Sequence, residues 1–365
     1  MSTILTTVLV VSAITVVFAA LLTLADRYIA DYGEVELIIN DEKEYTVEGG
    51  NSLLDTLRNE EVFIPSACGG KGTCGYCKVK VDSGGGPVLA TEKPMLTKDE
   101  LASDIRLSCQ IKVKEDIKIE IPEELFNVKE YTTTLVEKRP LTDRITLFRF
   151  ELPEGETIDF KPGQYVQLKA PEYEGSDEEV FRAYSIASSI KDDRHIELLI
   201  GYTGGICTTY CHKFLEEGDK VDINGPYGDF YYHDEDSEII MGAAGTGFAP
   251  IRSILHHMLD NDIQRTAKFY FGARTPEDLF LLDEIKMFEE KLKDFTFIPT
   301  LSRTTPEMNW EGDTGHVDDS LHKYMEKDKD YSAYLCGSPR MIESIVKALN
   351  EEGVGNEKIY FDDFG

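Results

Sequence analysis

Four cysteines carry the clearest chemical signal in the sequence. Cys68, Cys74 and Cys77 lie in one glycine-rich loop, and Cys109 follows 32 residues after the last of them. Four thiolates are the ligand set of a [2Fe–2S] cluster. A zinc site, the alternative, usually takes two close Cys or His pairs instead of three ligands together and one apart. The spacing therefore predicts an iron–sulfur cluster, and the glycines allow backbone N–H groups to point at its sulfides.

Two segments in the middle of the chain together predict an FAD site. They are a strand-like run and a turn that opens a helix: Arg182, Ala183, Tyr184 and Ser185, then Gly204, Gly205, Ile206, Cys207 and Thr208. The Arg182 guanidinium can pair with a pyrophosphate, the Tyr184 phenol can stack on an isoalloxazine ring, and the Ser185 hydroxyl can hydrogen-bond to its N5 atom. The amides at the helix N-terminus can bind phosphate. Each segment alone also fits an ordinary strand or turn.

The group Cys207, Cys211 and His212 has a spacing close to that of a haem-attachment motif. That motif has two residues between its cysteines, whereas three separate them here. We therefore expect these side chains to pack the helix that begins at the phosphate-binding turn. None of the seven histidines is assigned to catalysis or to a metal.

A further glycine turn, directly after the apolar segment 239–241, predicts a dinucleotide site. Its key residues are Gly245, Thr246, Gly247 and Pro250. The Lys-Ser/Thr pair of a Walker A loop is missing, and Pro250 replaces the third glycine of a G-x-G-x-x-G motif. A strand, a glycine turn and a helix N-terminus still form a cradle for a pyrophosphate, with an ordinary strand-to-helix turn as the alternative.

A later predicted strand ends at Cys336 and Gly337, which are followed by Ser338 and Pro339. Ligands of open α/β sheets bind at the carboxyl ends of the strands, so Cys336 and Gly337 are candidates for the same nucleotide site. The alternative for Cys336 is a buried structural cysteine.

The hydrophobic patterns divide the body of the chain into three folded parts. Short strands, a helix over 52–59 with Asn51 as its N-cap, and a long loop predict a small α+β domain that ends near Asn127. From 129 to about 232, short strands separated by turns predict an antiparallel barrel, with one strand ending at Ile223 before the turn Asn224-Gly225-Pro226. From 237 onward, apolar strands alternate with helices, which is typical of a doubly wound parallel sheet.

The N-terminus has the composition of a membrane anchor. Residues 1–25 include no charged side chain, and the apolar run from Ile4 exceeds the ~20 residues that a helix needs to cross a bilayer. A signal peptide would need a basic start and a shorter apolar core. The nearest basic residue, Arg27, follows the run, which favours a single-pass protein of the cell inner membrane with a cytoplasmic catalytic body.

Charge and cysteine count narrow the function classes. Lys and Arg number 38 against 68 Asp and Glu, a formal net charge of −30, so the surface repels phosphate backbones and nucleic acid is excluded as a partner. Such a charge keeps the surface well solvated and can steer a basic partner. Seven unevenly spaced cysteines argue against paired structural disulfides and for a reducing compartment.

Together the motifs cover residues 31–365 and resemble the ferredoxin–NADP reductase superfamily with an N-terminal ferredoxin domain. Within that superfamily, the sequence is similar to the family of F subunits of the sodium-translocating NADH:quinone reductases. The features that carry this resemblance are the anchor, the cysteine loop, Arg182–Ser185, Asn309–Gly312 with Thr314-Gly315, and Phe361–Gly365. The resemblance implies a transmembrane anchor at 1–30, a β-grasp 2Fe–2S ferredoxin domain at 31–127, an FAD-binding antiparallel β-barrel at 128–235 and an NAD(P)H-binding doubly wound domain at 236–365.

The resemblance also implies two residue roles and shows two departures. Cys336 would lie near the nicotinamide, and Phe364 would lie over the flavin, from where it must move before hydride transfer. Only the short acidic run 172–180 stands where members of that family usually have a longer insertion, so this chain departs from the family at the partner-docking surface. Ser302-Arg303 places a guanidinium where many NADH-linked relatives have an acidic residue, so NADPH stays open beside NADH, which we favour from the overall likeness.

Electron counting sets the expected function. NADH delivers a hydride, the cluster accepts one electron at a time, and FAD can exchange two electrons or one. We expect electrons to pass from NADH through FAD and the cluster to a membrane acceptor, with integral-membrane redox subunits and a quinone or protein acceptor as partners. The alternatives are an anchored reductase that serves an oxygenase or other terminal enzyme, and a non-catalytic subunit, against which the intact Gly245 turn and Cys336 argue.

Overall fold

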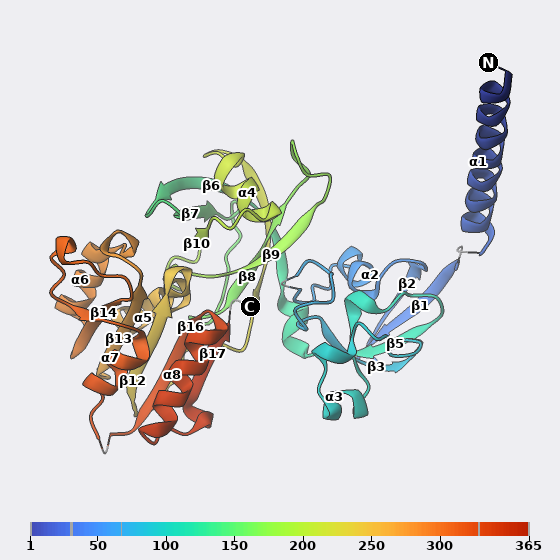
Figure 1. Ribbon diagram of the computed structural model, residues 1–365. Helices are drawn as coiled ribbons and strands as arrows, with labels where there is room; N and C mark the ends of the chain where they lie inside the picture. Colours follow the sequence, from blue (N-terminus) through green and yellow to red (C-terminus); the bar gives the residue numbers. More distant parts are fainter. Residues whose placement is uncertain (1, 30–31, 67, 328, 364–365) are drawn as a thin grey trace. The chain divides into compact units, whose positions relative to one another are not determined.

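A computed structural model describes the chain except for residues 1, 30–31, 67, 328 and 364–365 (Figure 1). The chain forms two compact units, Met1–Asn127 and Val128–Gly365. Helix α1 spans Ser2–Ile29. Within the part of the chain that the structure describes, no helix combines the length and the apolar character that a membrane crossing requires.

The rest of the first unit is a five-stranded mixed sheet in the order β2-β1-β5-β3-β4. Its elements are β1 (Glu34–Ile39), β2 (Lys43–Glu48), α2 (Leu53–Asn59), β3 (Lys78–Ser83), α3 (Lys98–Ala102), β4 (Ile105–Leu107) and β5 (Ile117–Glu120). Alternate residues of β1, Val35, Leu37 and Ile39, point into the core, where they meet the leucines of α2. The expected α+β character of this part is therefore confirmed, with β4 and α3 as elements that the sequence patterns did not predict.

Helix α2 begins one position later than expected, and its N-cap differs. Ser52, in extended conformation, is the cap: its Oγ accepts a hydrogen bond from the Asp55 backbone N–H at 3.1 Å. The prediction that Asn51 caps this helix is wrong. The Asn51 carbonyl instead accepts from the Val113 backbone N–H at 3.0 Å, so tertiary pairing places Asn51 outside the helix.

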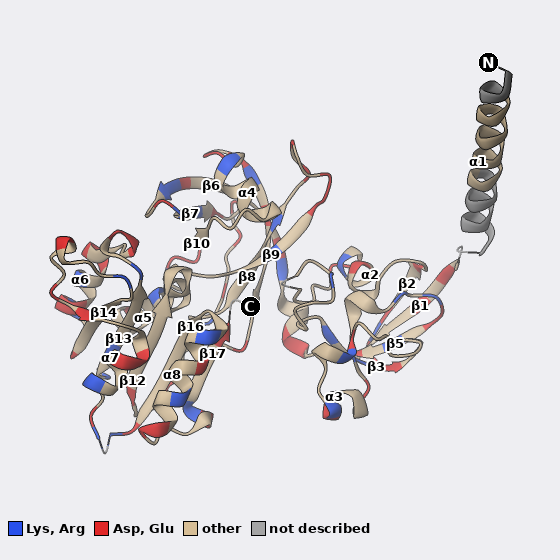
Figure 2. Ribbon diagram, viewed as in Figure 1, with Lys and Arg blue, Asp and Glu red and all other residues tan. Residues whose placement is uncertain are grey.

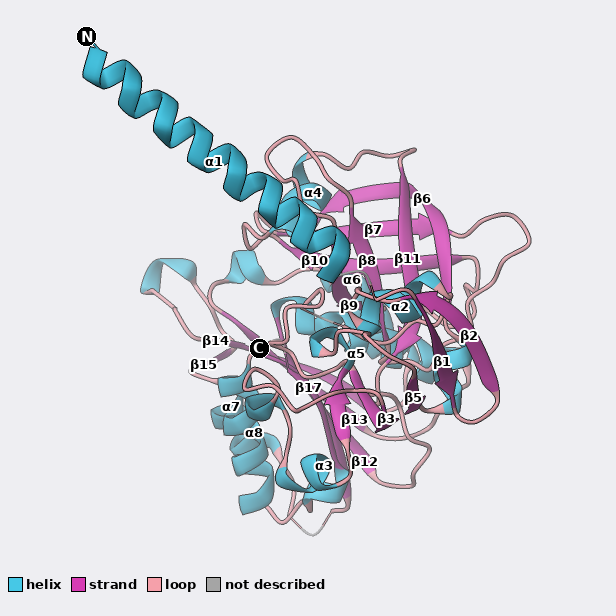
Figure 3. Ribbon diagram, turned by 90° about the vertical axis from the view of Figure 1, so that its right-hand side faces the viewer, coloured by secondary structure: helices cyan, strands magenta, loops and turns pink. Residues whose placement is uncertain are grey.

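The second unit begins with a six-stranded antiparallel sheet in the order β10-β7-β6-β11-β8-β9 (Figure 3). Its elements are β6 (Lys129–Pro140), β7 (Ile145–Glu151), β8 (Tyr165–Ala170), β9 (Val180–Ser185), β10 (His195–Gly201), α4 (Ile206–Lys213) and β11 (Lys220–Tyr227). A bridge between Ile186 and Leu198 links the two end strands, which gives the sheet its barrel-like form.

One strand of this barrel extends further than the sequence predicts. Strand β11 continues past Ile223 to Tyr227, and its register against β8 shifts between Asn224 and Tyr227. The expectation that Asn224-Gly225-Pro226 ends the strand is wrong, because the shift accommodates Pro226, which has no N–H for a regular ladder, inside the strand.

The second unit continues with a six-stranded parallel sheet in the order β15-β14-β13-β12-β16-β17. Its elements are β12 (Glu238–Ala244), α5 (Phe248–Asp260), β13 (Ala267–Ala273), α6 (Leu282–Lys291), β14 (Phe295–Leu301), β15 (Asp313–Thr314), α7 (Val317–Tyr324), β16 (Tyr331–Gly337), α8 (Pro339–Glu351) and β17 (Ile359–Asp363). The first strand of this sheet, β12, lies in its interior, and later strands are added on both sides of it. The strand order therefore reverses at β12, where doubly wound folds bind ligands.

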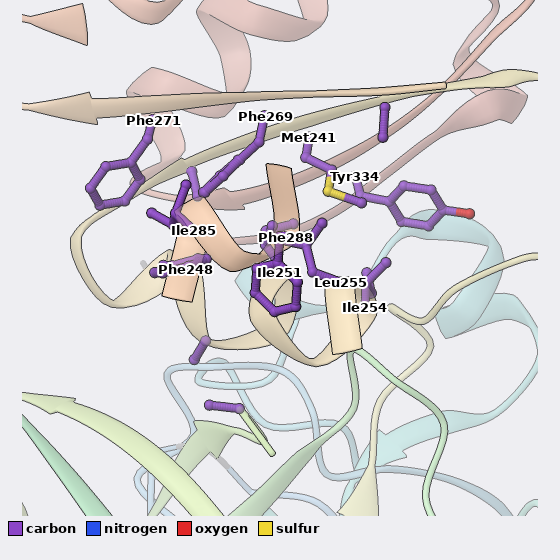
Figure 4. Close-up of a cluster of buried hydrophobic side chains, with 14 of the residues drawn as sticks. Met241, Phe248, Ile251, Ile254, Leu255, Phe269, Phe271, Ile285, Phe288 and Tyr334 are labelled. Atoms are coloured by element: carbon purple, nitrogen blue, oxygen red, sulfur yellow. The ribbon is translucent and has the colours of Figure 1, made fainter. Parts of the chain in front are cut away.

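Both faces of this sheet are buried, which explains its continuous apolar strands. Met241 packs with Phe248, on α5, and with Phe288, on α6, on one face (Figure 4). Ile240, the neighbouring residue of β12, belongs to the cluster on the other face with residues of α7 and α8. Consecutive side chains of one strand thus bury on opposite faces, as in parallel sheets covered by helices on both sides.

Charged residues of both signs occur in helices, strands and loops of both units (Figure 2). The net charge of −30 therefore does not come from a single element.

Candidate redox sites

The four cysteine sulfurs of the first unit come together as two pairs. Cys68 Sγ lies 3.3 Å from Cys74 Sγ, and Cys77 Sγ lies 3.3 Å from Cys109 Sγ. Among the described residues, no three His, Cys, Asp or Glu side chains are grouped so that they could hold a single metal ion. One tetrahedral zinc would need all four sulfurs around a single centre, whereas two irons need a pair of thiolates each. The paired arrangement therefore fits a [2Fe–2S] cluster better than zinc.

Within each pair, the hydrogen bond between the two sulfurs lowers the pKa of one thiol and raises that of the other, Cys74 in the first pair and Cys77 in the second. The hydrogen bond from Cys74 lowers the pKa of the Cys68 thiol. In the second pair, the hydrogen bond from Cys77 lowers the pKa of the Cys109 thiol. One sulfur of each pair is thus prepared to be a thiolate, the form that binds iron.

A buried ion pair supports the loop next to these sulfurs, and sequence reasoning missed it. Glu92 is fully buried, and its carboxylate accepts two hydrogen bonds from Arg106 at 2.6 and 2.9 Å. Arg106 also donates to the carbonyls of Gly85, Gly86 and Pro87. The segment 85–92 is thereby tied to strand β4, which leads to Cys109. A single acidic residue in a loop far from its partner carries no sequence signal for this pair.

The predicted flavin residues lie on β9 and at the start of α4, which pack together. Gly205 is the N-cap residue of α4, and Tyr184 packs against the barrel core to which Cys207 of that helix belongs. Burial raises the pKa of Tyr184, so the phenol stays neutral. The structure therefore brings the strand together with the turn that is predicted to bind phosphate, as the combination of motifs predicts.

Two buried polar atoms on β8 and β9 test whether FAD fits here. Ser185 Oγ and Gln167 Nε2 are buried and have no hydrogen-bond partner among the described residues. In the register of these strands, Gln167 is opposite Ala183 and Tyr165 is opposite Ser185, so both atoms belong to the same sheet face. Buried polar groups are normally satisfied, so an orphaned pair on one face fits a polar ligand. Sequence reasoning found Ser185 and missed Gln167.

The nucleotide turn packs tightly on the end of β16. A Cβ added to Gly247 would lie 2.1 Å from the Cys336 carbonyl oxygen, so only glycine allows this approach. Strands β12 and β16 are parallel neighbours with Ala243 opposite Cys336, which places Gly245, Thr246, Gly247 and Pro250 beside Cys336 and Gly337. The structure thus brings these two sequence-predicted groups to one sheet edge at the topological switch point.

Cys336 itself is fully buried. Burial, together with the charges of Asp362 and Asp363, raises the pKa of its thiol well above the usual range. The side chain is therefore a neutral thiol packed at the strand end and has no thiolate character.

Ser302 and Arg303 follow β14 at the same edge. The Ser302 and Arg303 backbone N–H groups donate to the carbonyls of Ala273 and Arg274, at 2.9 and 2.8 Å. Arg274, which sequence reasoning missed, thus pairs with Arg303 through the backbone. Phe364, the remaining predicted residue, lies outside the described residues; β17 ends at Asp363.

The Cys207, Cys211 and His212 group packs helix α4, as expected. Both thiols are buried in the barrel core. The His212 Nε2 atom lies 3.0 Å from the Ile200 carbonyl oxygen and its ring packs edge-on against Phe148.

A network of buried charges joins the barrel to the parallel sheet. Arg252, on α5, donates to the Ala187 carbonyl and to Glu197 of the barrel, both at 2.6 Å, and to Glu284 of α6 at 2.9 Å. Ser253 donates to the Ser188 carbonyl at 2.9 Å. Because α5 begins at the nucleotide turn, the same helix holds the turn and anchors it to the barrel.

These folds and sites define an oxidoreductase with flavin, nicotinamide and iron–sulfur domains. Family models describe three parts of the chain: a 2Fe–2S iron–sulfur cluster binding domain at 37–114, an oxidoreductase FAD-binding domain at 132–232 and an oxidoreductase NAD-binding domain at 241–347. The predicted FAD, nicotinamide and 2Fe–2S cofactors are thereby confirmed for the domains.

Curated relatives match nearly the whole chain. The F subunit of the Na(+)-translocating NADH-quinone reductase of Marinomonas sp. is 36% identical over 399 residues, covering 98% of both chains. That of Neisseria meningitidis serogroup B is 35% identical over 395 residues, covering 97% of both chains. The chain belongs to the family of F subunits of Na(+)-translocating NADH-quinone reductases, which confirms the resemblance inferred from its motifs.

Solved structures support the same domain set. A cytochrome P450 reductase from Amycolatopsis is 27% identical with a TM-score of 0.72, covering 90% of this chain and 98% of that one. A ferredoxin reductase of carbazole 1,9a-dioxygenase, 23% identical with a TM-score of 0.70, covers 91% of this chain and 98% of its own, and shares the fold.

Proposed function

We propose that this chain is the electron-input module of a quinone-reducing complex, and that it oxidises NADH. It takes a hydride from NADH and delivers electrons one at a time to an acceptor in the membrane. The observation that carries the proposal is the presence, in one chain of this family, of four cysteines in two sulfur pairs and of a glycine turn at the switch point of a parallel sheet.

Bound FAD would supply the conversion between a two-electron donor and a one-electron cluster. The chain's own residues hold and orient it: Arg182 and the turn 204–208 bind phosphate, Tyr184 packs beside the ring system, and Ser185 donates its orphaned hydroxyl to the ring nitrogen. Cys68, Cys74, Cys77 and Cys109 would hold the cluster through their two sulfur pairs.

The NADH pyrophosphate binds at Gly245, Thr246, Gly247 and Pro250, and Cys336 with Gly337 lies beside the nicotinamide. Ser302 and Arg303 lie at the edge that receives the adenosine ribose, and we propose NADH over NADPH as the physiological donor. The role that the resemblance implies for Phe364, to cover the flavin until the nicotinamide binds, stays a prediction. This role lies on a residue outside the described part of the chain.

Residues 1–30 form a single membrane anchor, on the strength of the uncharged run at 1–25. The domains follow at 31–127, 128–235 and 236–365, in the cytoplasm at the inner membrane, beside integral-membrane redox subunits and a quinone. The membrane location agrees with the named relatives, which are subunits of a sodium-translocating reductase.

The experiment that tests this proposal starts from native membranes. Full-length protein is extracted in mild detergent, the copurifying chains are identified, and NADH-dependent quinone reduction is assayed with and without sodium. Copurifying multi-span subunits and sodium-stimulated quinone reduction support the proposal. Isolation of the chain alone, or with a soluble oxygenase that it reduces, contradicts it. NADPH in place of NADH tests the donor in the same assay.

A further inference from the structure

The residue after the fourth cysteine makes a contact that the proposed function does not use. Gln110 Nε2 lies 3.4 Å from Cys109 Sγ and 3.4 Å from the Cys109 carbonyl oxygen. A thiolate sulfur and a carbonyl oxygen can only accept hydrogen bonds, so the amide must present its NH₂ group to both. The side chain therefore donates to a sulfur that we assign to the cluster.

The orientation of this amide is held from its other end. The Thr91 hydroxyl donates to Gln110 Oε1 at 2.8 Å. Turning the amide over would place its oxygen against the Cys109 sulfur and its NH₂ where the hydroxyl donates, so the observed orientation satisfies every group. Thr91 thus positions the donor without touching the sulfur.

The cluster loop leaves room for the amide by means of a glycine. Gly72 has φ +72°, and a Cβ at this position would lie 2.6 Å from Gln110 Nε2. The glycine therefore leaves space for the Gln110 amide beside the Cys109 sulfur.

Thr91 belongs to the segment that the buried ion pair anchors. The next residue is Glu92, which is fully buried and bound to Arg106, and whose carboxylate also accepts from the Leu107 backbone N–H at 3.1 Å. The loop that carries Thr91 and the strand that leads to Cys109 are hence locked together. Arg106 and Glu92 fix the frame in which Thr91 orients Gln110.

We propose that Gln110 raises the reduction potential of the cluster, and that Thr91 is the residue that positions it for this task. A reduced cluster carries one more negative charge than an oxidised one, so an N–H directed at a ligand sulfur stabilises the reduced form more. This inference rests on the proposed assignment of Cys109 as a cluster ligand, and it explains why a polar side chain occupies this position.

The test is a redox titration of the full-length holoprotein, with the cluster followed by EPR and the flavin by absorption. Gln110→Leu removes the donor, and we expect the equilibrium for cluster reduction to fall roughly tenfold, which is about 59 mV for a one-electron couple. Gln110→Glu, of the same shape, adds a negative charge and should lower it further. Thr91→Val should lower the equilibrium constant for cluster reduction by roughly threefold. Thr91→Ser keeps the hydroxyl and should retain the parental potential.

Controls separate this inference from the proposed function. Gln264→Glu, the same exchange in the other unit, should leave the cluster potential unchanged. If every variant keeps the parental EPR signal and its equilibrium constant for cluster reduction stays within twofold of the parent's, the proposed role of Gln110 is wrong and the cluster assignment is unaffected. A parent protein that shows no [2Fe–2S] signal overturns the ligand assignment and this inference with it. Thr91 is exposed, so its variants test the idea even if Gln110 variants fail to assemble.

Discussion

The ferredoxin unit holds its redox group with side chains, whereas the 128–365 unit forms its sites mainly with backbone and strand ends. Cys68, Cys74 and Cys77 come from one loop and Cys109 from 32 residues further along the chain, and the four sulfurs form two pairs. In the second unit, Gly247 and Cys336 follow or end different strands and meet only because those strands are neighbours. A side-chain site is lost with one ligand, while a backbone site is sensitive to how closely two segments approach.

The two units also use buried charge differently. In the first, the pair of Glu92 with Arg106 locks a loop to a strand. In the second, Arg252 bridges two carboxylates that come from the barrel and from α6. The first pair stabilises a site from within one domain, and the second sets the position of one fold against another. We therefore expect substitutions in the first unit to disturb the cluster site, and substitutions in the second to disturb the packing of the barrel on the parallel sheet.

The largest effect is expected at the cluster. Cys74→Ser removes one thiolate from its pair, so the [2Fe–2S] absorption and EPR signals should disappear, while NADH still reduces the flavin in a stopped-flow experiment. The loss of the cluster without a loss of flavin reduction is expected because the two sites are formed by different units. Retention of the cluster signal would show that the ligand set is wrong, and loss of flavin reduction would show that the two sites are not independent.

The nucleotide turn should be next in sensitivity. Gly247→Ala places a methyl group 2.1 Å from the Cys336 carbonyl oxygen, so the turn must shift. A displacement of ~1 Å at a reacting site can cost ~10²-fold, and we expect a loss of that order in the rate of flavin reduction by NADH. The measurement is stopped-flow reduction across NADH concentrations, with flavin content and the cluster spectrum as controls. A parental rate would place the cofactor elsewhere.

The charge network predicts an acid-dependent loss of stability in the second unit. Burial by itself would raise the pKa of Glu284, but the hydrogen bond from His256 and the Arg252 charge outweigh it and lower the pKa to about 2, from 4.5. The stabilisation is complete above pH 4.5 and is lost as the pH falls toward 2. With partial solvent screening, we expect the ionised Glu284 carboxylate to contribute about 2 kcal/mol to the free energy of unfolding at neutral pH.

Urea unfolding of this unit at several pH values, followed by flavin fluorescence, measures that loss. Glu284→Gln should be less stable than the parent at neutral pH and should show a flatter pH profile. Glu290→Gln is the matched control, since Glu290 is an exposed residue on the same helix. Parallel profiles for the Glu284 variant and the parent would remove the network from the explanation.

The smallest effect is expected at Ser185. The hydrogen bond that we propose from its orphaned hydroxyl to the flavin is neutral and worth about 1 kcal/mol, so Ser185→Ala should slow flavin reduction by roughly tenfold or less. FAD content and the cluster spectrum should not change. Ser185→Thr keeps a hydroxyl and should retain most of the rate. Equal rates for all three proteins would remove the proposed bond to the ring nitrogen.

Local patterns of residue types account for much of the fold. The doubly wound sheet was predictable because its strands are apolar on both faces, and the barrel because turn residues punctuate its short strands. The errors arose where tertiary contacts compete with local preference. Asn51 is a good cap by residue type, yet its backbone pairs with Val113 and leaves Ser52 as the cap. Strand β11 passes through Pro226 because a register shift absorbs it.

The sequence by itself determined which chemistry this protein carries, because cluster ligands and glycine turns depend on residue types at short spacings along the chain. It indicated the four cysteines, the Arg182–Ser185 run and the Gly245–Gly247 turn. Only the tertiary structure decided how the sulfurs pair, which buried donors lack a partner among the described residues, and that Thr91, Glu92 and Arg106 lie behind Gln110. Those contacts join residues whose separation follows no repeating pattern, so they become visible only when the folded chain brings them together.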